Sequence, residues 1–453
     1  MFAGPGAPPL TVPPPRGVEH RHNVLPPDHP NRDSLADEVH ARPSEPLTTP
    51  SRATYVAILV GQEERERERG HVAALCERHA MQPPCADSAQ FSAQLGSLLF
   101  KWERHGEFSS YTMFSPGLSA RPFSEPVASL LPTGWLQALP GKTLVAAHAK
   151  LIASEHPLDS QALAALFDGN IVVGGEIAGG AGLAYTDFRR HADGFARFVV
   201  CNRSLTERQA GRTLQRLFEI EAYRMMALLA LPVARQLTPR IADIEASLRD
   251  LTARIADDGG QDEILLQELT RLAAEIERGL SGSEFRFGAC KAYHEIVVSR
   301  ITELRETRLP GIQQIEEFMT RRLTPAVATC ATASQRLHGL SERVARASAL
   351  LSTRVEIARE RQNQALLASM DRRAKLQLRL QQAVEGLSTA AIVYYVAGVV
   401  GYLAKAGKAG GLLKDPDLLV GASIPVIILV VVWALRRARR KLHLDGAGSD
   451  ERH

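Results

Sequence analysis

The spacing of hydrophobic and polar residues changes along the 453-residue chain. Between about residues 50 and 202, short apolar runs such as ATYVAILV (53–60) and TLVAAHAKLIA (143–153) alternate with polar and glycine-rich segments, a pattern typical of strands. Further strands are predicted at 108–114, 170–178, 182–188 and 195–200, with a hairpin turn at 191–194. Helices are predicted between them at about 63–79 and 160–167. This part is therefore expected to be a mixed sheet with helices packed against it.

From residue 204 the apolar positions recur in steps of three and four, which predicts helices. The capping box SLTE at Ser204 begins a helix expected to end at Pro232. Two heptad-like helices joined by the DDGG turn at 257–260 are expected to form an antiparallel coiled hairpin. Shorter helices are expected at 285–308 and 312–322.

Thr324 and Pro325 are typical of an N-cap and the proline at the first helical position. No proline follows until after Ala404, so one long helix is expected to continue into an apolar segment; two helices broken near Gly386 are the alternative.

Two uncharged segments of 18 residues lie at 387–404 and 418–435. Each would be about 27 Å long as a helix, which is enough to cross a hydrocarbon core. A glycine-rich polar turn separates them, so the pair predicts a transmembrane hairpin. Basic residues precede the first segment and the run RRARRK follows the second, which favours both ends in the cytoplasm.

The first segment carries small and hydroxylated residues on one helical face, whereas the second is rich in Ile, Val and Leu. Such a face is suited to close helix packing in lipid. It could contact the second segment or another copy of the chain, and in the latter case it could line a pore. The residues of this predicted interface or pore face are Ser388, Ala391, Tyr395, Gly398, Gly401 and Tyr402.

The pattern predicts an α+β cytoplasmic domain, then long coiled helices and a transmembrane hairpin. The expected parts are a disordered proline-rich lead (1–25), a mixed α/β domain (26–203), a helical region (204–324), a stalk helix (325–386), the first span (387–404), an external loop (405–417), the second span (418–435) and a basic cytoplasmic tail (436–453).

The net charge and the cysteine content argue against several classes of protein. The net charge is +4, and the basic run near the C-terminus accounts for it, so no groove for nucleic acid is expected. The first residues have neither a basic start nor an apolar core, so no secretory signal is expected.

An odd number of cysteines without a CxxC pair argues against a disulfide framework or a zinc site. They are Cys76, Cys85, Cys201, Cys290 and Cys330.

The sequence shows no clean catalytic motif. LPGKT (139–143) lacks the spacing and the following helix of a phosphate loop, and GGEIAGGAG (174–182) lacks dinucleotide-binding spacing. The alternating charges at 63–69 are interpreted as a solvated helix start. No nucleophile is paired with a base, and no cofactor is predicted. Three motifs are rich in histidine, arginine and acidic residues. This composition is compatible with a ligand-binding site and equally with ordinary turns and helix caps. Their candidate ligand-binding residues are His40, Arg42, Glu103, His105, Glu107, Asp187 and His191.

Several longer stretches resemble a family of bacterial membrane-anchored proteins, the domain of unknown function 3422 family. They include HPNRDSLADEVHARPSEPL (29–47), KWERHGEFSSYTMF (101–114), TDFRRHADGF (186–195), EIEAYRMMALLALPVAR (219–235) and NQALLASMDRRAKLQLRLQQAVEGLS (363–388). The resemblance implies a membrane-anchored bacterial protein and no particular activity.

The layout also resembles, more weakly, that of CorA-type magnesium channels, which are pentamers whose first span lines the pore. Gly401, Tyr402 and Leu403 stand where that family has Gly-Met-Asn. The asparagine that helps to hold hydrated magnesium is absent, so the resemblance implies an architecture and leaves magnesium selectivity in doubt.

Three functions follow as expectations. The first is a non-enzymatic protein of the bacterial inner membrane that forms homo-oligomers and binds a ligand or partner with its cytoplasmic domain. The second is a divergent channel or transporter, for which a divalent cation would be the ligand. The third is a membrane-tethered enzyme that uses the His, Arg and acidic motifs.

Overall fold

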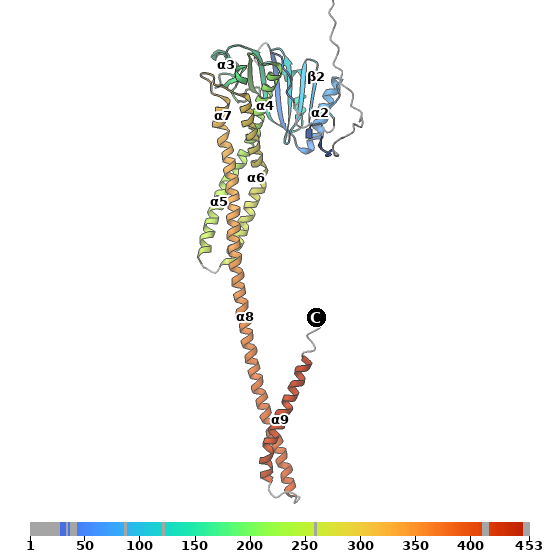
Figure 1. The fold of residues 1–453 in the computed structure, drawn as a ribbon, viewed down its shortest axis with the longest axis vertical. Helices are drawn as coiled ribbons and strands as arrows, with labels where there is room; N and C mark the ends of the chain where they lie inside the picture. The colour runs from blue at the N-terminus through green and yellow to red at the C-terminus, as the bar shows by residue number, and fades with distance from the viewer. Residues whose placement is uncertain are drawn as a thin grey trace, which may run out of the picture. The chain divides into compact units, whose positions relative to one another are not determined.

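A computed structural model describes residues 28–32, 35–36, 43–85, 88–119, 123–257, 261–409 and 416–446 (Figure 1). The chain divides into two compact units. The first comprises Met1–Arg254 and Glu268–Arg346, and the second comprises Ile255–Gln267 and Ala347–His453. The sheet and the candidate site belong to the first unit, and the apolar segments at 387–404 and 418–435 belong to the second.

Within the described residues, the first unit holds one eight-stranded mixed sheet of order β2-β3-β4-β1-β5-β8-β7-β6. Neighbouring strands are antiparallel except β5 and β8, which are parallel. The strands are β1 (Ser51–Leu59), β2 (Gln90–Leu95), β3 (Leu98–Arg104), β4 (Phe108–Pro116), β5 (Lys142–Ala153), β6 (Val173–Ile177), β7 (Gly182–Thr186) and β8 (Ala196–Asn202). The mixed α+β fold is thus as predicted, with β2 and β3 as additional strands.

Short helices connect the strands, and longer helices follow the sheet. The connecting helices are η1 (Gln62–Glu64), α2 (Arg65–Arg78), η2 (Val127–Leu130), η3 (Leu136–Ala138), α3 (Ser160–Leu166) and η4 (Ala178–Gly180). The later helices are α4 (Glu207–Leu228), α5 (Ala230–Ala256), α6 (Asp262–Leu304), α7 (Ile315–Arg322), α8 (Thr324–Ala409) and α9 (Pro416–Gly446).

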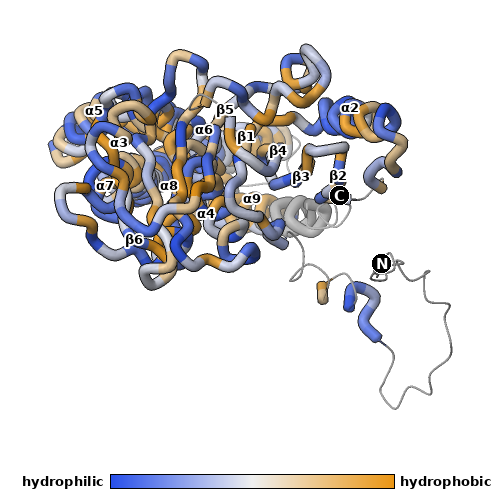
Figure 2. Tube along the Cα trace, turned by 90° about the horizontal axis from the view of Figure 1, so that it is seen from above, coloured by the Kyte–Doolittle hydropathy of each residue, from blue (hydrophilic) through white to orange (hydrophobic). Residues whose placement is uncertain are grey.

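Helices cover both faces of the sheet. Alternate residues of β1 point to opposite sides, so Tyr55 packs with Phe218 of α4 in one core cluster. Val56 instead packs with Val72 of α2 in another cluster. Figure 2 shows α2 and α4 on opposite sides of these strands. The α4 face forms the wall of the candidate site described below.

Helix α4 begins two residues later than predicted. Its N-cap is Thr206, whose capping box is completed by Gln209. The Ser204 N–H instead donates to the carbonyl of Ala181, so this backbone continues the pairing between β7 and β8. Helix α4 ends at Leu228, a few residues before the predicted stop at Pro232. Helix α5 starts at Ala230, so the proline falls in its first turn, where no N–H donor is required.

The α5 and α6 helices carry the predicted apolar stripes. Ile244 and Leu248 of α5 and Leu269 and Leu272 of α6 are buried. Arg254 joins the two helices by donating to Glu268 over 2.9 Å. The connecting turn at 258–260 lies outside the described residues. Helix α6 continues to Leu304, so the separate helix predicted at 285–308 is its second half, and the short helix predicted at 312–322 is α7.

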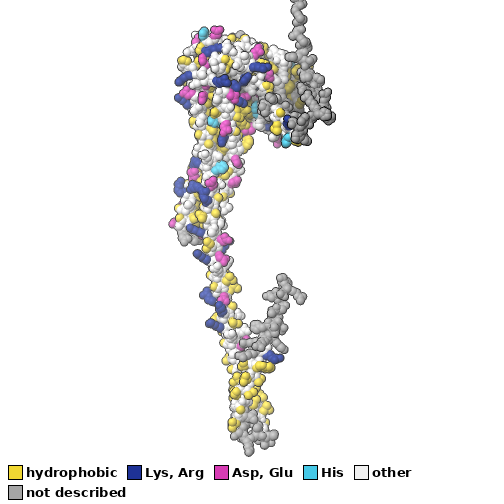
Figure 3. Space-filling model, in the orientation of Figure 1, with side chains coloured by type: hydrophobic (Ala, Val, Ile, Leu, Met, Phe, Trp, Pro, Cys, Tyr) yellow, Lys and Arg dark blue, Asp and Glu magenta, His cyan; other side chains and the backbone are white. Residues whose placement is uncertain are grey.

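Helix α8 is continuous through Gly339 and Gly386, as the longer of the two sequence interpretations predicts. Among the described residues one helical run, Ile315–Gly407, is long and apolar enough to cross a membrane. Its most apolar window is 6% buried. The apolar part of α9, Val420–Leu435, is shorter. Figure 3 shows hydrophobic side chains gathered where the end of α8 and α9 lie.

Within the second unit, α9 packs on a face of α8 that differs from the predicted interface. Ala404 and Ile427 are buried, and the added Cβ of an alanine at Gly401 would lie 3.8 Å from Val420. Tyr395 and Tyr402, in contrast, are 72% and 78% exposed. The two tyrosines of the predicted interface are therefore exposed, whereas Gly401 lies against α9. Ser388, Ala391 and Gly398 are exposed too.

Candidate functional site

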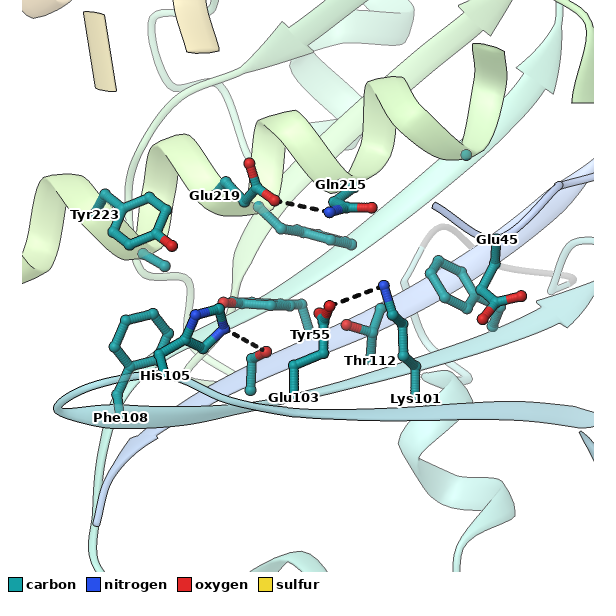
Figure 4. A pocket seen from close by; sticks show the side chains of 15 residues that line it. Glu45, Tyr55, Lys101, Glu103, His105, Phe108, Thr112, Gln215, Glu219 and Tyr223 are labelled. Carbon is teal, nitrogen blue, oxygen red and sulfur yellow. Dashed lines mark hydrogen bonds and ion pairs between the residues drawn. The ribbon is translucent and has the colours of Figure 1, made fainter. Parts of the chain in front are cut away.

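A pocket lined by both charged and aromatic residues lies between the sheet and α4 in the first unit (Figure 4). Strands β1, β3 and β4 form its floor, and α4 forms its roof. Because α4 carries a glycine at position 211, it approaches the backbone of Glu45 so closely that an added Cβ would lie 1.7 Å from that carbonyl oxygen. The lining residues are Glu45, Tyr55, Lys101, Glu103, His105, Phe108, Ser110, Thr112, Phe114, Gly211, Gln215, Phe218, Glu219, Ala222 and Tyr223.

Strand β3 contributes a buried ion pair to the floor. Lys101 Nζ lies 3.0 Å from Glu103 Oε1, and both side chains are less than one-tenth exposed. The same ammonium donates to the carbonyl oxygen of Pro43 over 2.8 Å. Leu98, Phe100 and Trp102 occupy the alternate positions and are buried on the opposite face. The strand therefore carries charge into one side of the sheet and apolar surface into the other.

The roof presents a second carboxylate. Glu219 accepts a hydrogen bond from Gln215 over 2.8 Å, one turn earlier on α4. Its other oxygen accepts from Arg300 of α6. The guanidinium pKa of Arg300 is raised: burial lowers it, but the attraction of Glu219 and Glu303 outweighs burial. The carboxylate is thus held in place and aimed along the pocket wall.

Aromatic and hydroxyl groups close the other end. The His105 ring stacks on Phe108 with centroids 4.3 Å apart and meets Tyr223 edge-on. His105 Nε2 lies 3.3 Å from the Ser110 hydroxyl. Burial raises the pKa of Tyr55 well above its usual range, and the nearby Tyr223 and Glu103 raise it further. Tyr55 is therefore a neutral hydroxyl at physiological pH.

The Ser110–His105 contact corrects the sequence-based statement that no hydroxyl nucleophile is paired with a base. The fold creates the pair because β3 and β4 form a hairpin that brings positions five apart together. A hydroxyl beside an imidazole is one requirement of nucleophilic catalysis. Ser110, however, is only 2% exposed.

The pocket itself is small, with a cavity volume of about 20 Å³. This is room for about one water molecule. Two wider hollows adjoin it. One, of about 320 Å³, shares Glu45 and Lys101 with the pocket, and the other, of about 240 Å³, shares Gln215 and Glu219. A ligand's terminal group could enter the narrow part while the rest of the ligand occupies a hollow.

The charges of this pocket favour a hydrogen-bond donor. Three carboxylates, those of Glu45, Glu103 and Glu219, line it. Lys101 pairs with Glu103 and Arg300 pairs with Glu219, so one negative charge remains. Aromatic rings stand beside the carboxylates, and such rings also attract cations. The pocket can therefore accept hydrogen bonds from an ammonium or hydroxyl group. Among the described residues, no set of three or more His, Cys, Asp or Glu side chains is arranged to hold a metal.

The predicted site residues fall in different places. Glu103 and His105 line the pocket. Glu107, at the β3–β4 turn, instead accepts from Arg286 and from Tyr293 of α6, the latter over 2.8 Å. His40 and Arg42 lie outside the described residues.

Asp187 and His191 lie on the β7–β8 connection, several strands away along the sheet. His191 Nε2 is 2.9 Å from Asp187, and Nδ1 is 2.9 Å from Asp168. The hydrogen bond from His191, assisted by Arg197, lowers the pKa of Asp168. These side chains cross-link a loop to the sheet and do not line the pocket of Glu103 and His105.

Sequence reasoning missed most of the pocket. Tyr55 and Glu219 carry no local motif, because one lies in an apolar strand and the other on an amphipathic helix. The available signal was in LLFKWER (98–104), where Lys101 and Glu103 alternate with the aromatic residues of an apolar strand.

Comparison with known proteins gives a family and no activity. No curated protein and no solved structure matches the chain, and the resemblance to CorA-type channels gains no support from these comparisons. The model of one family, described as "Protein of unknown function (DUF3422)", matches residues 27–442. The match covers nearly the whole chain, and the chain therefore belongs to the DUF3422 family.

Proposed function

We propose that this chain is a membrane-anchored, oligomeric binding protein of the bacterial inner membrane. The observation that carries the proposal is the exposure of the apolar part of α8, of which 6% is buried. An apolar surface of this size is unfavourable in water and favourable in lipid. Helix α9 would complete a transmembrane hairpin, with both termini in the cytoplasm as the basic flanks favour.

Membrane anchoring is tested by carbonate extraction of membranes from cells that express the full chain. The wild type should stay in the membrane fraction. Val396→Arg combined with Val399→Arg should release it, because each arginine at the centre of a span costs about 2.5–3.5 kcal/mol. Both valines are exposed in α8. Leu376→Arg with Leu380→Arg, which are also exposed but lie outside the apolar segment, is the control. Extraction of the wild type would refute anchoring.

The orientation of the two proposed spans in the membrane is tested by cysteine labelling. A cysteine introduced by Lys408→Cys, within the predicted external loop, should react with a membrane-impermeant maleimide in intact spheroplasts. One introduced by Lys441→Cys, in the basic tail, should react only after lysis. The reverse pattern would contradict the proposed cytoplasmic location of the termini.

The binding role is assigned to the pocket of Glu103 and Glu219. We assign it a primary amine, because an ammonium group is close in size to the single water that the 20 Å³ cavity can hold. Glu219 and Glu45 offer acceptors on either side of the buried Lys101–Glu103 pair. The remainder of the ligand would extend into the adjoining hollow of about 320 Å³.

Putrescine and tetramethylammonium are the probes for this assignment. Putrescine should raise the melting temperature of the purified protein, whereas tetramethylammonium is too large for the narrow cavity and should not. Glu219→Gln should weaken putrescine binding by about tenfold, the usual contribution of one charged hydrogen bond. The control is Glu207→Gln, an exposed carboxylate at the start of the same helix, which should leave binding unchanged. Equal stabilisation by both cations would overturn the amine assignment.

The exposed face of α8 favours self-association as part of the proposal. Tyr395 and Tyr402 are exposed, so they are available to a second copy of the chain in the membrane. A channel that uses this face as a pore lining is the second candidate function. Divalent-cation flux through vesicles that contain the purified protein, abolished by Tyr402→Trp, would favour the channel.

A further inference from the structure

A cluster of cationic side chains lies on the sheet face opposite the amine pocket. The register places Arg52 of β1 directly opposite Lys150 of β5, and His148 of β5 directly opposite Arg197 of β8. These three strands are neighbours at the centre of the sheet. Residues two apart on a strand share a face, so all four side chains point to the same side.

This arrangement of cations is unfavourable unless an anion lies among them. Like charges directly opposite each other on antiparallel strands are destabilising. Lys150 is 7% exposed, and within the described part of the chain it forms no hydrogen bond or ion pair. A buried ammonium without an acidic partner carries a desolvation cost that no ion pair offsets. Burial, together with Arg52 and Arg197, lowers the pKa of Lys150, in keeping with this lack of a counter-charge.

The two arginines are only partly compensated. Arg197 donates to Asp168 over 3.0 Å, and Arg52 lies 3.7 Å from the exposed carboxylate of Glu125. The Nε atom of each arginine is buried and lacks a hydrogen-bond partner among the described residues. Each guanidinium therefore keeps one buried donor that no described residue satisfies.

The Phe123 ring covers the cluster. Lys150 Nζ lies 5.2 Å and Arg197 Cζ lies 5.1 Å from its centroid, so both cations contact the same ring. Cation–π contacts offset part of the desolvation cost but supply no counter-charge. Asp168 and Glu125 pair with Arg197 and Arg52, whereas Lys150 has no acidic contact among the described residues. His148 adds no charge at neutral pH, because burial lowers its pKa to about 4.

We infer that Arg52, Lys150 and Arg197 form a binding site for the phosphate group of a small phosphorylated molecule. A phosphate oxygen accepts hydrogen bonds from guanidinium and ammonium groups alike. A phosphate group carries three acceptor oxygens, one for each of the three cations, whereas a carboxylate carries two. The site lies beneath Phe123 on the face turned away from α4, so it is distinct from the proposed amine pocket.

The test uses the full chain in detergent and inorganic phosphate, titrated by calorimetry against chloride of equal ionic strength. Phosphate should bind saturably and raise the melting temperature. Lys150→Met should weaken binding by about tenfold or more, because it removes a charged donor from the anion. The matched control is Lys142→Met, an exposed lysine at the start of the same strand, which should bind phosphate like the wild type.

A purely structural cluster gives the opposite result. Phosphate would then act no more strongly than chloride, or Lys150→Met would bind it like the wild type, and either result would overturn the inference. Equal affinity for acetate would overturn the assignment to phosphate. Should Lys150→Met fail to fold, Arg52→Gln is the second variant, and it too should weaken binding by about tenfold.

Discussion

The carboxylate of Glu68 shows how one residue can organise an apolar cluster. It is fully buried on α2, and its Oε1 atom accepts from Trp102 over 2.9 Å and from Tyr111 over 2.6 Å. The interpretation of the alternating charges at 63–69 as a solvated helix start is wrong for this position. A helix repeats every 3.6 residues, so an alternating run must turn some charges inward.

Glu68→Ala should destabilise the protein by about 2–5 kcal/mol, because it leaves two donors unsatisfied among apolar side chains. Glu68→Gln keeps an acceptor and should cost less. The urea midpoint of the sheet's unfolding is the measurement. Glu66→Ala, whose side chain is 79% exposed, should change it little. Equal midpoints for the two alanine variants would contradict the role of Glu68.

The buried His148 side chain predicts how the stability of the fold depends on pH. Burial lowers its pKa to about 4, while Asp193 raises it and Arg197 lowers it by smaller amounts. The unfolded chain takes up this proton near pH 6.5 and the folded chain only near pH 4, so stability should fall as pH decreases between these values. The full difference corresponds to about 3 kcal/mol.

His148→Gln should flatten this part of the stability profile, measured by urea unfolding at intervals from pH 7 to pH 4. The exposed His79→Gln is the control and should leave the slope unchanged. An unaltered slope in His148→Gln would show that other groups account for acid sensitivity.

At the scale of elements, the close approach of α4 to the segment before β1 builds the pocket. Leu47 N donates to the carbonyl of Glu207 over 3.0 Å, and Gly211 lies against the backbone of Glu45. These contacts hold Glu45 at the mouth of the pocket. A helix propensity argument alone would have judged Gly211 unfavourable, since glycine costs up to about 1 kcal/mol in a helix.

Gly211→Ala should therefore be destabilising, since its Cβ would lie 1.7 Å from the Glu45 oxygen and would displace that segment. Gly288→Ala on α6, where no atom lies within 4 Å of the new Cβ, should be stabilising by about 0.5–1 kcal/mol. The melting temperatures of the two variants should move in opposite directions. A shift in the same direction would contradict the close packing at Gly211.

At the scale of the whole molecule, the exposed tyrosines of α8 lead to a prediction about oligomerisation. Tyr395 and Tyr402 are exposed on a helix face that small residues share. In lipid, such a face gains packing and hydrogen bonds from a second copy. The mass of the detergent-solubilised protein, measured by light scattering, should exceed that of one chain. Tyr395→Ala with Tyr402→Ala should shift it towards the monomer.

The control for this shift is Leu429→Ala on α9, a position that is also exposed but carries no polar group. It should leave the mass unchanged, since a leucine gains little from leaving lipid for another helix. A strictly monomeric wild type would rule out the oligomeric part of the proposal.

The sequence by itself determined the elements with strong periodicity. Apolar strands such as 53–60 and 143–153, the stripes of α5 and α6, and the continuous α8 all follow from local spacing, because burial of one face imposes a period of 2 or 3.6 residues. The match of the chain to its family likewise rests on sequence.

Only the tertiary structure decided which distant side chains meet. Lys101 and Glu103 are charged residues of a kind expected at the surface, yet the fold buries them as an ion pair beneath α4. The pairing of β1 with β5 and β8 aligns Arg52, Lys150 and Arg197, although about a hundred residues separate the first two. Such contacts depend on strand order and register, and these are set by the packing of the whole sheet rather than by any local pattern.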